Sequence, residues 1–288
     1  MASEKVYEMV TEKLIEALEA GIVPWQKPWV CIGGEMKNLI SKKAYRGINP
    51  FLLAVAAQTQ GFSSPYWLTF KQCSGLGGKV KKGSKSAMII FWMFLEKENK
   101  ETGKISKFPM LRYYRVFNTD QCEGLEDKIP ASDTKLEEIE PIENAEKIFD
   151  DFFNQNPLAP KLTIGGDRAC YSQGADTVTV PKREQFKTAE GFYATVYHEA
   201  IHSTGHETRL ARFGKDAYGS ENYSKEELVA EFGSAMLCAT AGIEKETIEN
   251  QAAYIRSWLK ALNNDKKMAV LAASKSQKAV DFVLGVTE

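Results

Sequence analysis

The sequence lacks the features that would assign it at once to a common class. Its five cysteines are widely spread and include no CxxC pair, which excludes a disulfide framework and a cysteine zinc site. No apolar run approaches the roughly 20 residues that span a bilayer, and no basic segment followed by an apolar core marks a signal peptide. With 43% hydrophobic and 26% charged residues, we expect a globular cytoplasmic protein that does not enter a membrane.

The two halves carry opposite net charges, although the whole chain carries only −1. Residues 1–128 sum to +6 and residues 129–288 sum to −7. Opposite charges in two halves indicate two modules with different partners.

The order of predicted elements indicates an α+β fold in two domains. We expect a first domain at 1–124 with a small antiparallel sheet, an acidic linker at 125–141, and a second domain at 142–288. Helical spacing or strand composition predicts helices at 4–20, 49–60, 142–154, 188–204, 225–240 and 245–263, and strands at 66–70, 87–97, 110–120, 161–164 and 176–180.

Histidine is the rarest informative residue, and all three histidines lie within nine positions. His198, Glu199 and His202 form the motif HExxH in an apolar helical pattern. Residues four apart share one face of a helix, so both imidazoles can reach one Zn²⁺ or another divalent transition metal. Glu199 is then the candidate general base for a metal-activated water.

The third ligand is predicted on the next helix, which begins SKEELVAEFGSAML. Ser224 is a candidate N-cap, and Glu227 and Glu231 share one face. We assign Glu227 as ligand and Glu231 as the partner of a ligating imidazole, with the reverse assignment open.

Three further features near this motif have two interpretations each. His206 is either a second contact around the metal or substrate, or a helix C-terminal cap; the metzincin pattern would need histidine where Thr208 stands. Tyr254 is either a transition-state stabiliser or a core residue. The strand at 176–180 either holds substrate along its edge or is purely structural.

The first half is basic and aromatic, with four of the five tryptophans. Rings stack on unpaired bases while cations follow phosphates, so this composition favours single-stranded DNA, although the rings could instead form a sheet core. The lysine-rich GGKVKKGSKS lacks the spacing of a P-loop. The candidate DNA contacts are Trp25, Lys27, Trp29, Lys43, Tyr45, Arg46, Lys71, Lys79, Lys81, Lys82 and Lys85.

Several segments together resemble one protein family. PWQKPW, AYRGINPFLL, YWLTFKQ, LGGKVKKGSKS and YYRVFNTDQCEG resemble the single-stranded-DNA-binding domain of ArdC-type antirestriction proteins, also found in plasmid TraC primases. YSQGADTVTVPKREQF, HEAIHSTGHETRL and EELVAEFGSAML resemble the zincin-type metallopeptidase domain that follows it in ArdC.

The resemblance implies a protein of a mobile element, such as a conjugative plasmid, that protects incoming DNA from host restriction. It implies single-stranded DNA as a partner and a metal site that includes His206, and it leaves a protein substrate in the host restriction machinery as an expectation. The alternative is a purely DNA-binding protein whose metal site is structural or vestigial.

Overall fold

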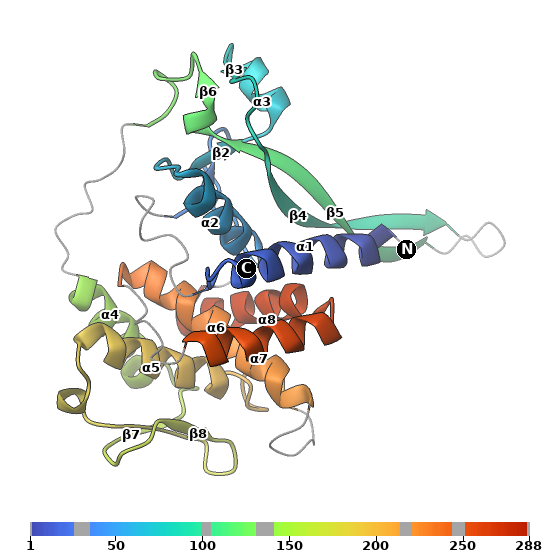
Figure 1. Cartoon of the computed structure of the whole chain (residues 1–288). Helices are drawn as coiled ribbons and strands as arrows, with labels where there is room; N and C mark the ends of the chain where they lie inside the picture. Colours follow the sequence, from blue (N-terminus) through green and yellow to red (C-terminus); the bar gives the residue numbers. More distant parts are fainter. Residues whose placement is uncertain are drawn as a thin grey trace.

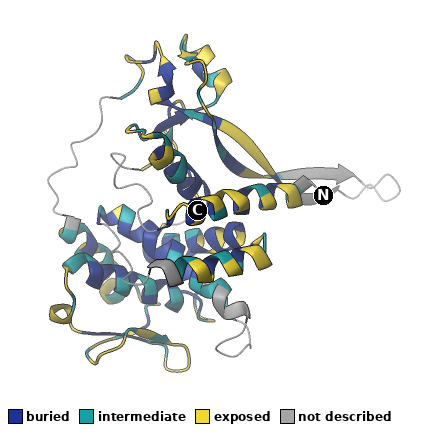
Figure 2. Ribbon diagram, in the orientation of Figure 1, coloured by how far each residue is buried: buried dark blue, intermediate teal, exposed yellow. Residues whose placement is uncertain are grey.

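A computed structural model describes residues 2–25, 35–98, 105–130, 141–213, 221–243 and 251–286 of the chain. An upper lobe carries the longest strands and a lower lobe is mainly helical, with helix α1 (Ala2–Glu19) running between them (Figure 1). Buried residues line the surfaces where the lobes meet, so the halves share an interior (Figure 2). Within the described ranges, no helix combines the length and the apolar character needed to cross a membrane.

The upper lobe is built on a four-stranded sheet of order β1-β2-β5-β4. Its long antiparallel pair β4–β5 places Ile90 opposite Tyr113 and leaves β4 at the edge. A separate two-stranded ladder, β3–β6, sits beside α3. The elements are β1 (Lys37–Asn38), α2 (Asn49–Gln60), β2 (Tyr66–Leu68), α3 (Phe70–Gly75), β3 (Lys79–Val80), β4 (Ala87–Glu98), β5 (Ile105–Asn118) and β6 (Cys122–Glu123).

The lower lobe packs helices beside a three-stranded sheet of order β7-β9-β8. Helix α6 lies against both α5 and α8, and the Ser276 hydroxyl on α8 donates to the Val229 carbonyl on α6 at 2.8 Å. The elements are α4 (Pro141–Asp150), β7 (Lys161–Ile164), β8 (Cys170–Ser172), β9 (Thr177–Val180), α5 (Ala189–Ser203), α6 (Glu221–Ala241), α7 (Gln251–Asn264) and α8 (Met268–Val283).

Trp25 joins the two halves through aromatic contacts. Its ring is 1% exposed and lies edge-on to Phe232 at 5.1 Å and to Trp258 at 5.8 Å between ring centroids. Phe232 in turn stacks on Phe51 of α2 at 4.7 Å. One hydrophobic core therefore runs from the first half into α6 and α7, because large aromatic rings from both halves interdigitate there.

Most predicted elements are present, and the differences have local causes. Helix 49–60 and strand 161–164 have the predicted bounds. The end of the predicted strand 66–70 is wrong: Thr69 and Gln72 form a capping box that begins α3 at Phe70. Helix α6 begins at Glu221, so Ser224 lies inside it and is not the N-cap.

Among the described elements, β8, α8, α3 and the two-residue strands β1, β3 and β6 have no counterpart among the predictions. The predicted linker 125–141 lies largely outside the described residues, and the domain boundaries stay predictions.

Candidate metal centre and nucleic-acid surface

Helix α5 presents the two histidines of HEAIH side by side. It begins at the N-cap Thr188, whose hydroxyl accepts the Gly191 N–H at 3.0 Å, and buries Tyr193, Val196 and Ile201 against its neighbours. The four-residue spacing leaves the Nε2 atoms of His198 and His202 only 3.1 Å apart.

Helix α6 brings Glu227 to the same point. Its carboxylate oxygens lie 3.5 Å from the Nε2 atoms of both histidines. Within the described part of the chain these three residues form the one group of metal-ligating side chains whose ligand atoms lie within 4.8 Å of one another. Two imidazoles and one carboxylate are donors that suit a divalent transition metal and leave a coordination position open.

The close approach of α6 to α5 depends on Gly233. A β-carbon at that position would lie 2.7 Å from Ile201 Cγ1 and 2.9 Å from its Cγ2. The Ser234 hydroxyl also donates to the Ala194 carbonyl at 2.8 Å. Small side chains on α6 thus set the spacing that lets Glu227 reach the histidines.

Glu226 and Arg212 support His202 from the other side. The Glu226 carboxylate lies beside the His202 ring, with Oε1 3.9 Å from Nδ1, and pairs with the largely buried Arg212 guanidinium at 2.6 Å. Arg212 also donates to the Ile201 carbonyl at 2.8 Å. Burial alone would lower the pKa of His202, but Glu226 and the neighbouring carboxylates raise it.

Sequence reasoning missed Glu226 and gave the role of imidazole partner to Glu231. A run of two glutamates cannot show which one faces the neighbouring helix, because that depends on how the helices cross. The carboxylate of Glu231 instead lies close to the phenol of Tyr254, where after burial it contributes to raising the pKa of that phenol.

Glu199 is buried beneath the histidines, at 8% exposed. Burial raises the pKa of its carboxyl above the usual range, opposed by His198 and His202 and by the backbone N–H of Tyr171 on β8. The edge strand β8 is therefore the strand nearest the candidate general base. The strand 176–180, predicted as a possible edge, is instead the central strand β9, paired on both sides.

His206 lies outside the group of ligand atoms that meet within 4.8 Å. Its Nδ1 accepts the backbone N–H of Thr208 at 3.3 Å, just beyond the end of α5. The neighbouring Arg209, whose side chain is 1% exposed, donates to the Ser203 carbonyl at 2.7 Å and to Asp176 at 3.1 Å. This contact fastens the β8–β9 turn to the end of α5, and a role of His206 toward substrate stays a prediction.

Tyr254 is held within the packing of α6 and α7. Its phenol oxygen accepts the Trp25 indole N–H at 2.8 Å, and burial raises the pKa of the phenol. A role in stabilising a transition state stays a prediction.

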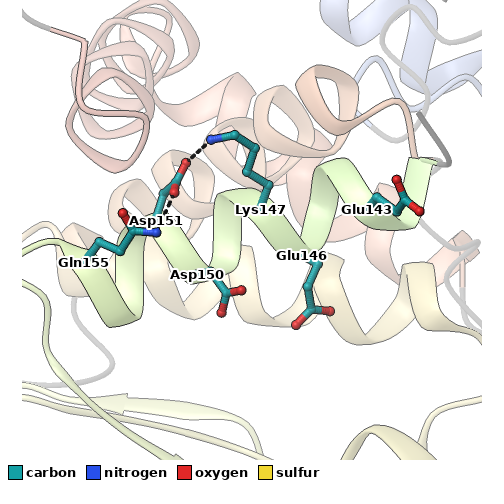
Figure 3. A pocket seen from close by; sticks show the side chains of 6 residues that line it. All are labelled: Glu143, Glu146, Lys147, Asp150, Asp151 and Gln155. Atoms are coloured by element: carbon teal, nitrogen blue, oxygen red, sulfur yellow. Dashed lines mark hydrogen bonds and ion pairs between the residues drawn. The ribbon is translucent and has the colours of Figure 1, made fainter. Parts of the chain in front are cut away.

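A separate hollow of about 480 Å³ lies along α4 and the π-helical turn after it, remote from the HEAIH residues in sequence (Figure 3). One helical segment supplies all six residues that line it, and Lys147 and Asp151 form an ion pair at 2.6 Å. It offers carboxylates from a single element and no imidazole.

The predicted DNA contacts divide into exposed cations and buried rings. Trp25 and Tyr45 are 1% and 7% exposed, so the prediction that their rings stack on bases is wrong for this conformation. Both rings belong to the core because other elements of the fold cover them. Lys27 and Trp29 lie outside the described residues. The remaining predicted residues are exposed: Lys43, Arg46, Lys71, Lys79, Lys81, Lys82 and Lys85.

Exposed aromatic rings occur elsewhere in the upper lobe. Phe70, at the start of α3, is 60% exposed, and Phe91, Trp92, Tyr113 and Tyr114 on the β4–β5 pair are 40–46% exposed. For the β4 segment the sequence favoured a sheet core, because alternate residues of a strand are buried. The β4 edge, which only the sheet order reveals, is what leaves Phe91 and Trp92 partly open.

Two family models match the chain in the order of its two halves. The model described as the N-terminal domain of anti-restriction factor ArdC matches residues 4–117. The model described as a zincin-like metallopeptidase matches residues 147–275, and this class implies a divalent metal.

Solved structures of the antirestriction ArdC protein from plasmid R388 are similar to the chain over 97% of both proteins. The metal-free structure is 35% identical with a TM-score of 0.78, and the Mn(II)-bound structure is 34% identical with a TM-score of 0.76.

Curated relatives fall into two kinds. The protein y4eC of Sinorhizobium fredii is 33% identical, with 96% of this chain aligned to 91% of its length. Two DNA primases TraC of Escherichia coli are 36% identical over 96% of this chain. The chain spans only 20% and 27% of the lengths of these primases.

Proposed function

Since the chain belongs to the ArdC family of antirestriction proteins, we propose that it binds single-stranded DNA and carries a metal-dependent peptidase that together protect incoming plasmid DNA from restriction. We place this activity in the cytoplasm, where a transferred strand arrives. The observation that carries the peptidase part is the convergence of His198, His202 and Glu227 beside the buried Glu199.

The metal ligands in this proposal are His198, His202 and Glu227, and the ion is Zn²⁺ or another divalent transition metal. The chemistry supplied by such an ion when bound is a lowered pKa of water and a polarised carbonyl. In this proposal Glu226 orients the His202 ring from its Nδ1 side, and Arg212 fixes Glu226 through their ion pair.

Glu199 is the proposed general base. It accepts the proton of the attacking water and passes it to the amide nitrogen that leaves, which divides the proton movement into two steps at one carboxylate. Its position follows from helical geometry, because the residue after His198 projects beside the ligand face.

Replacing Glu199 by Gln tests this role. We expect metal affinity to stay within about twofold and hydrolysis of a labelled unstructured protein, such as casein, to fall about 10²–10⁴-fold. Activity would be measured with and without single-stranded DNA. A Glu199→Gln protein that keeps its metal and cleaves at the wild-type rate would exclude Glu199 as the base.

The DNA-binding part rests on the exposed lysines around α3, β3 and the turn into β4. Lys81 also donates to the Asp120 carbonyl at 2.9 Å, which fixes its position next to β5. Such a cluster neutralises backbone phosphates without reading sequence. We expect binding to single strands to weaken with salt, and less steeply after three lysines are removed.

Fluorescence titration at several salt concentrations measures this slope. The variant carries Ala at Lys81, Lys82 and Lys85, and the control, with the same change of charge, carries Ala at the exposed Lys161, Lys182 and Lys260. Loss of Lys81, Lys82 and Lys85 should flatten the slope of log affinity against log salt concentration by about two units, and the control substitutions should flatten it by much less. Equal slopes for both variants would remove this surface from the proposal.

The second candidate is a protein that protects by DNA binding alone, with a structural metal site. It is favoured by the exposure of the lysines, which need no catalysis to cover a restriction site. Antirestriction in cells separates the two: protection that survives Glu199→Ala but fails with the Lys81, Lys82 and Lys85 variant supports binding alone. The opposite result supports proteolysis, with a protein of the host restriction machinery as substrate.

A further inference from the structure

A cavity of about 370 Å³ lies where the two halves of the chain meet. The turn at 44–49, the edge strand β4 and helix α8 line it together. No HEAIH residue takes part, so the cavity is distinct from the candidate metal centre.

The floor of the cavity is apolar and one wall is aromatic. Ile48, Ile90 and Val270 are only 3–6% exposed and form buried apolar surface, whereas Trp92, which shares a face of β4 with Ile90, is 42% exposed. An exposed ring next to a hollow with an apolar floor is suited to stack on another planar ring.

The rim carries cations from both halves. Arg46, with a side chain 54% exposed, pairs with Asp281 of α8, and Lys278 on α8 adds a second cation. The Gly47 N–H donates to Gln277 Oε1 at 3.1 Å, so the turn is fixed onto α8. Because Arg46 neutralises the Asp281 carboxylate, Lys278 leaves the rim with a net positive charge that can bind a phosphate.

The cavity also faces main-chain polar groups of the sheet edge. The Asn49 side chain accepts the Ile90 N–H at 2.7 Å and donates to the Ile90 carbonyl at 2.9 Å. These bonds show that the peptide groups of Ile90 point away from β5. Alternation along a strand directs the peptide groups of Trp92 the same way, which provides a donor and an acceptor for the edge of a base.

We propose that this cavity binds one unpaired nucleotide of single-stranded DNA, with its base against Trp92 and a phosphate between Arg46 and Lys278. An aromatic wall with adjacent cations matches a base and its phosphate better than it matches a peptide strand. The proposal rests on the proposed DNA binding and adds that helix α8 of the second half contributes to it. A paired base is stacked within a duplex and cannot enter.

Charge reversal on α8 tests the cation. Lys278→Glu is compared with Lys275→Glu, which makes the same change of charge at another exposed position of α8 that does not line the cavity. The readout is the Kd for a fluorescein-labelled oligothymidylate. We expect Lys278→Glu to weaken binding about tenfold and Lys275→Glu to change it less than about threefold. Equal effects of the two substitutions would overturn the proposal.

An abasic strand tests the stacking. Trp92→Ala should weaken binding of the base-bearing oligonucleotide about tenfold and leave an abasic strand of equal length within about twofold. Thermal unfolding would first establish that the variant folds. An equal loss on both strands contradicts a base contact.

The outcomes separate this proposal from the function on which it rests. If the wild-type protein does not bind single-stranded DNA, both the proposed DNA binding and the nucleotide cavity are refuted. If the wild type binds single strands, and Lys278→Glu and Trp92→Ala bind them as tightly, only the nucleotide cavity is overturned and the β4 edge stays available to a peptide strand.

Discussion

Replacing Gly233 by Ala should push helix α6 away from α5 and weaken metal binding. The new β-carbon would meet three carbons of Ile201 at 2.7–2.9 Å, whereas carbon atoms in contact normally lie about 3.5–4.0 Å apart. Rotation of Ile201 about χ1 gives no relief, because both of its γ-carbons are among the three and one would replace the other. Ile201 is fully buried, so the helices must separate by about 1 Å.

Two magnitudes follow. Overpacking of this kind costs about 1–3 kcal/mol of folding free energy. A shift of about 1 Å also exceeds the tolerance of roughly 0.2 Å on metal–ligand distances, so we expect the affinity for Zn²⁺ to fall at least about tenfold. Competition with a chromophoric chelator measures the affinity, and chemical unfolding of the metal-free protein measures the stability.

The control is Gly174→Ala, at a glycine whose added β-carbon would meet no atom within 4 Å. It should leave metal affinity unchanged and stability equal or slightly higher. In the double variant Gly233→Ala/Ile201→Ala, the combined loss of stability should be at least about 1 kcal/mol smaller than the sum of the single losses. Wild-type affinity and stability in Gly233→Ala would refute the view that the tight α5–α6 contact builds the site.

Three other predictions follow from contacts around the site. Arg212→Gln should destabilise the fold by about 3–5 kcal/mol, because the mostly buried Glu226 carboxylate loses its cation. It should also weaken metal affinity about 10–100-fold through His202. Chemical unfolding measures the stability and chelator competition the affinity, and unchanged affinity would show that Glu226 does not orient the His202 ring. Trp25→Ala should cost about 3–5 kcal/mol of folding stability, because it removes a ring from the core, but it should leave the Kd for single-stranded DNA within about twofold. A large loss of DNA affinity with intact stability would restore Trp25 as a DNA contact. Arg209 holds the pKa of Asp176 below its usual value. The stabilisation by this carboxylate is therefore complete above the unfolded pKa of about 3.9 and is lost as pH falls below it. The difference in unfolding free energy between wild type and Asp176→Asn should shrink from pH 7 to about pH 3, and a constant difference would mean that the charge of Asp176 does not stabilise the fold.

The sequence could predict the local part of the candidate site. His198, Glu199 and His202 lie on one helical face because their spacing alone determines it. Helix 49–60 was predictable for a similar reason, since Pro50 at its first turn and Gly61 beyond its end are local signals. Such features depend on residues within one or two helical turns.

The contacts between elements could not be predicted. Glu226 and Glu227 are neighbours in sequence, and only the crossing of α6 over α5 decides that one faces His202 Nδ1 and the other both Nε2 atoms. Trp25 lies in a Pro/Trp-rich segment that resembles an exposed loop, yet Phe232 and Trp258, more than 200 residues later, cover it. Composition carries no information on such distant partners.

The two halves match separate family models, yet α6 makes them physically dependent on each other. Glu227 lies near its start, facing the histidines, and Phe232 lies little more than one turn further along, stacked on Phe51 of the first half. Removal of the first half would expose Trp258 on α7 and Phe232 on α6, the helix that supplies the candidate ligand Glu227. Conversely, removal of the second half would uncover Trp25 and Phe51 and take away α8, which closes the cavity at the junction. Because the helix that supplies the third ligand also carries the ring that joins the halves, a change in packing at the junction acts directly on the position of Glu227.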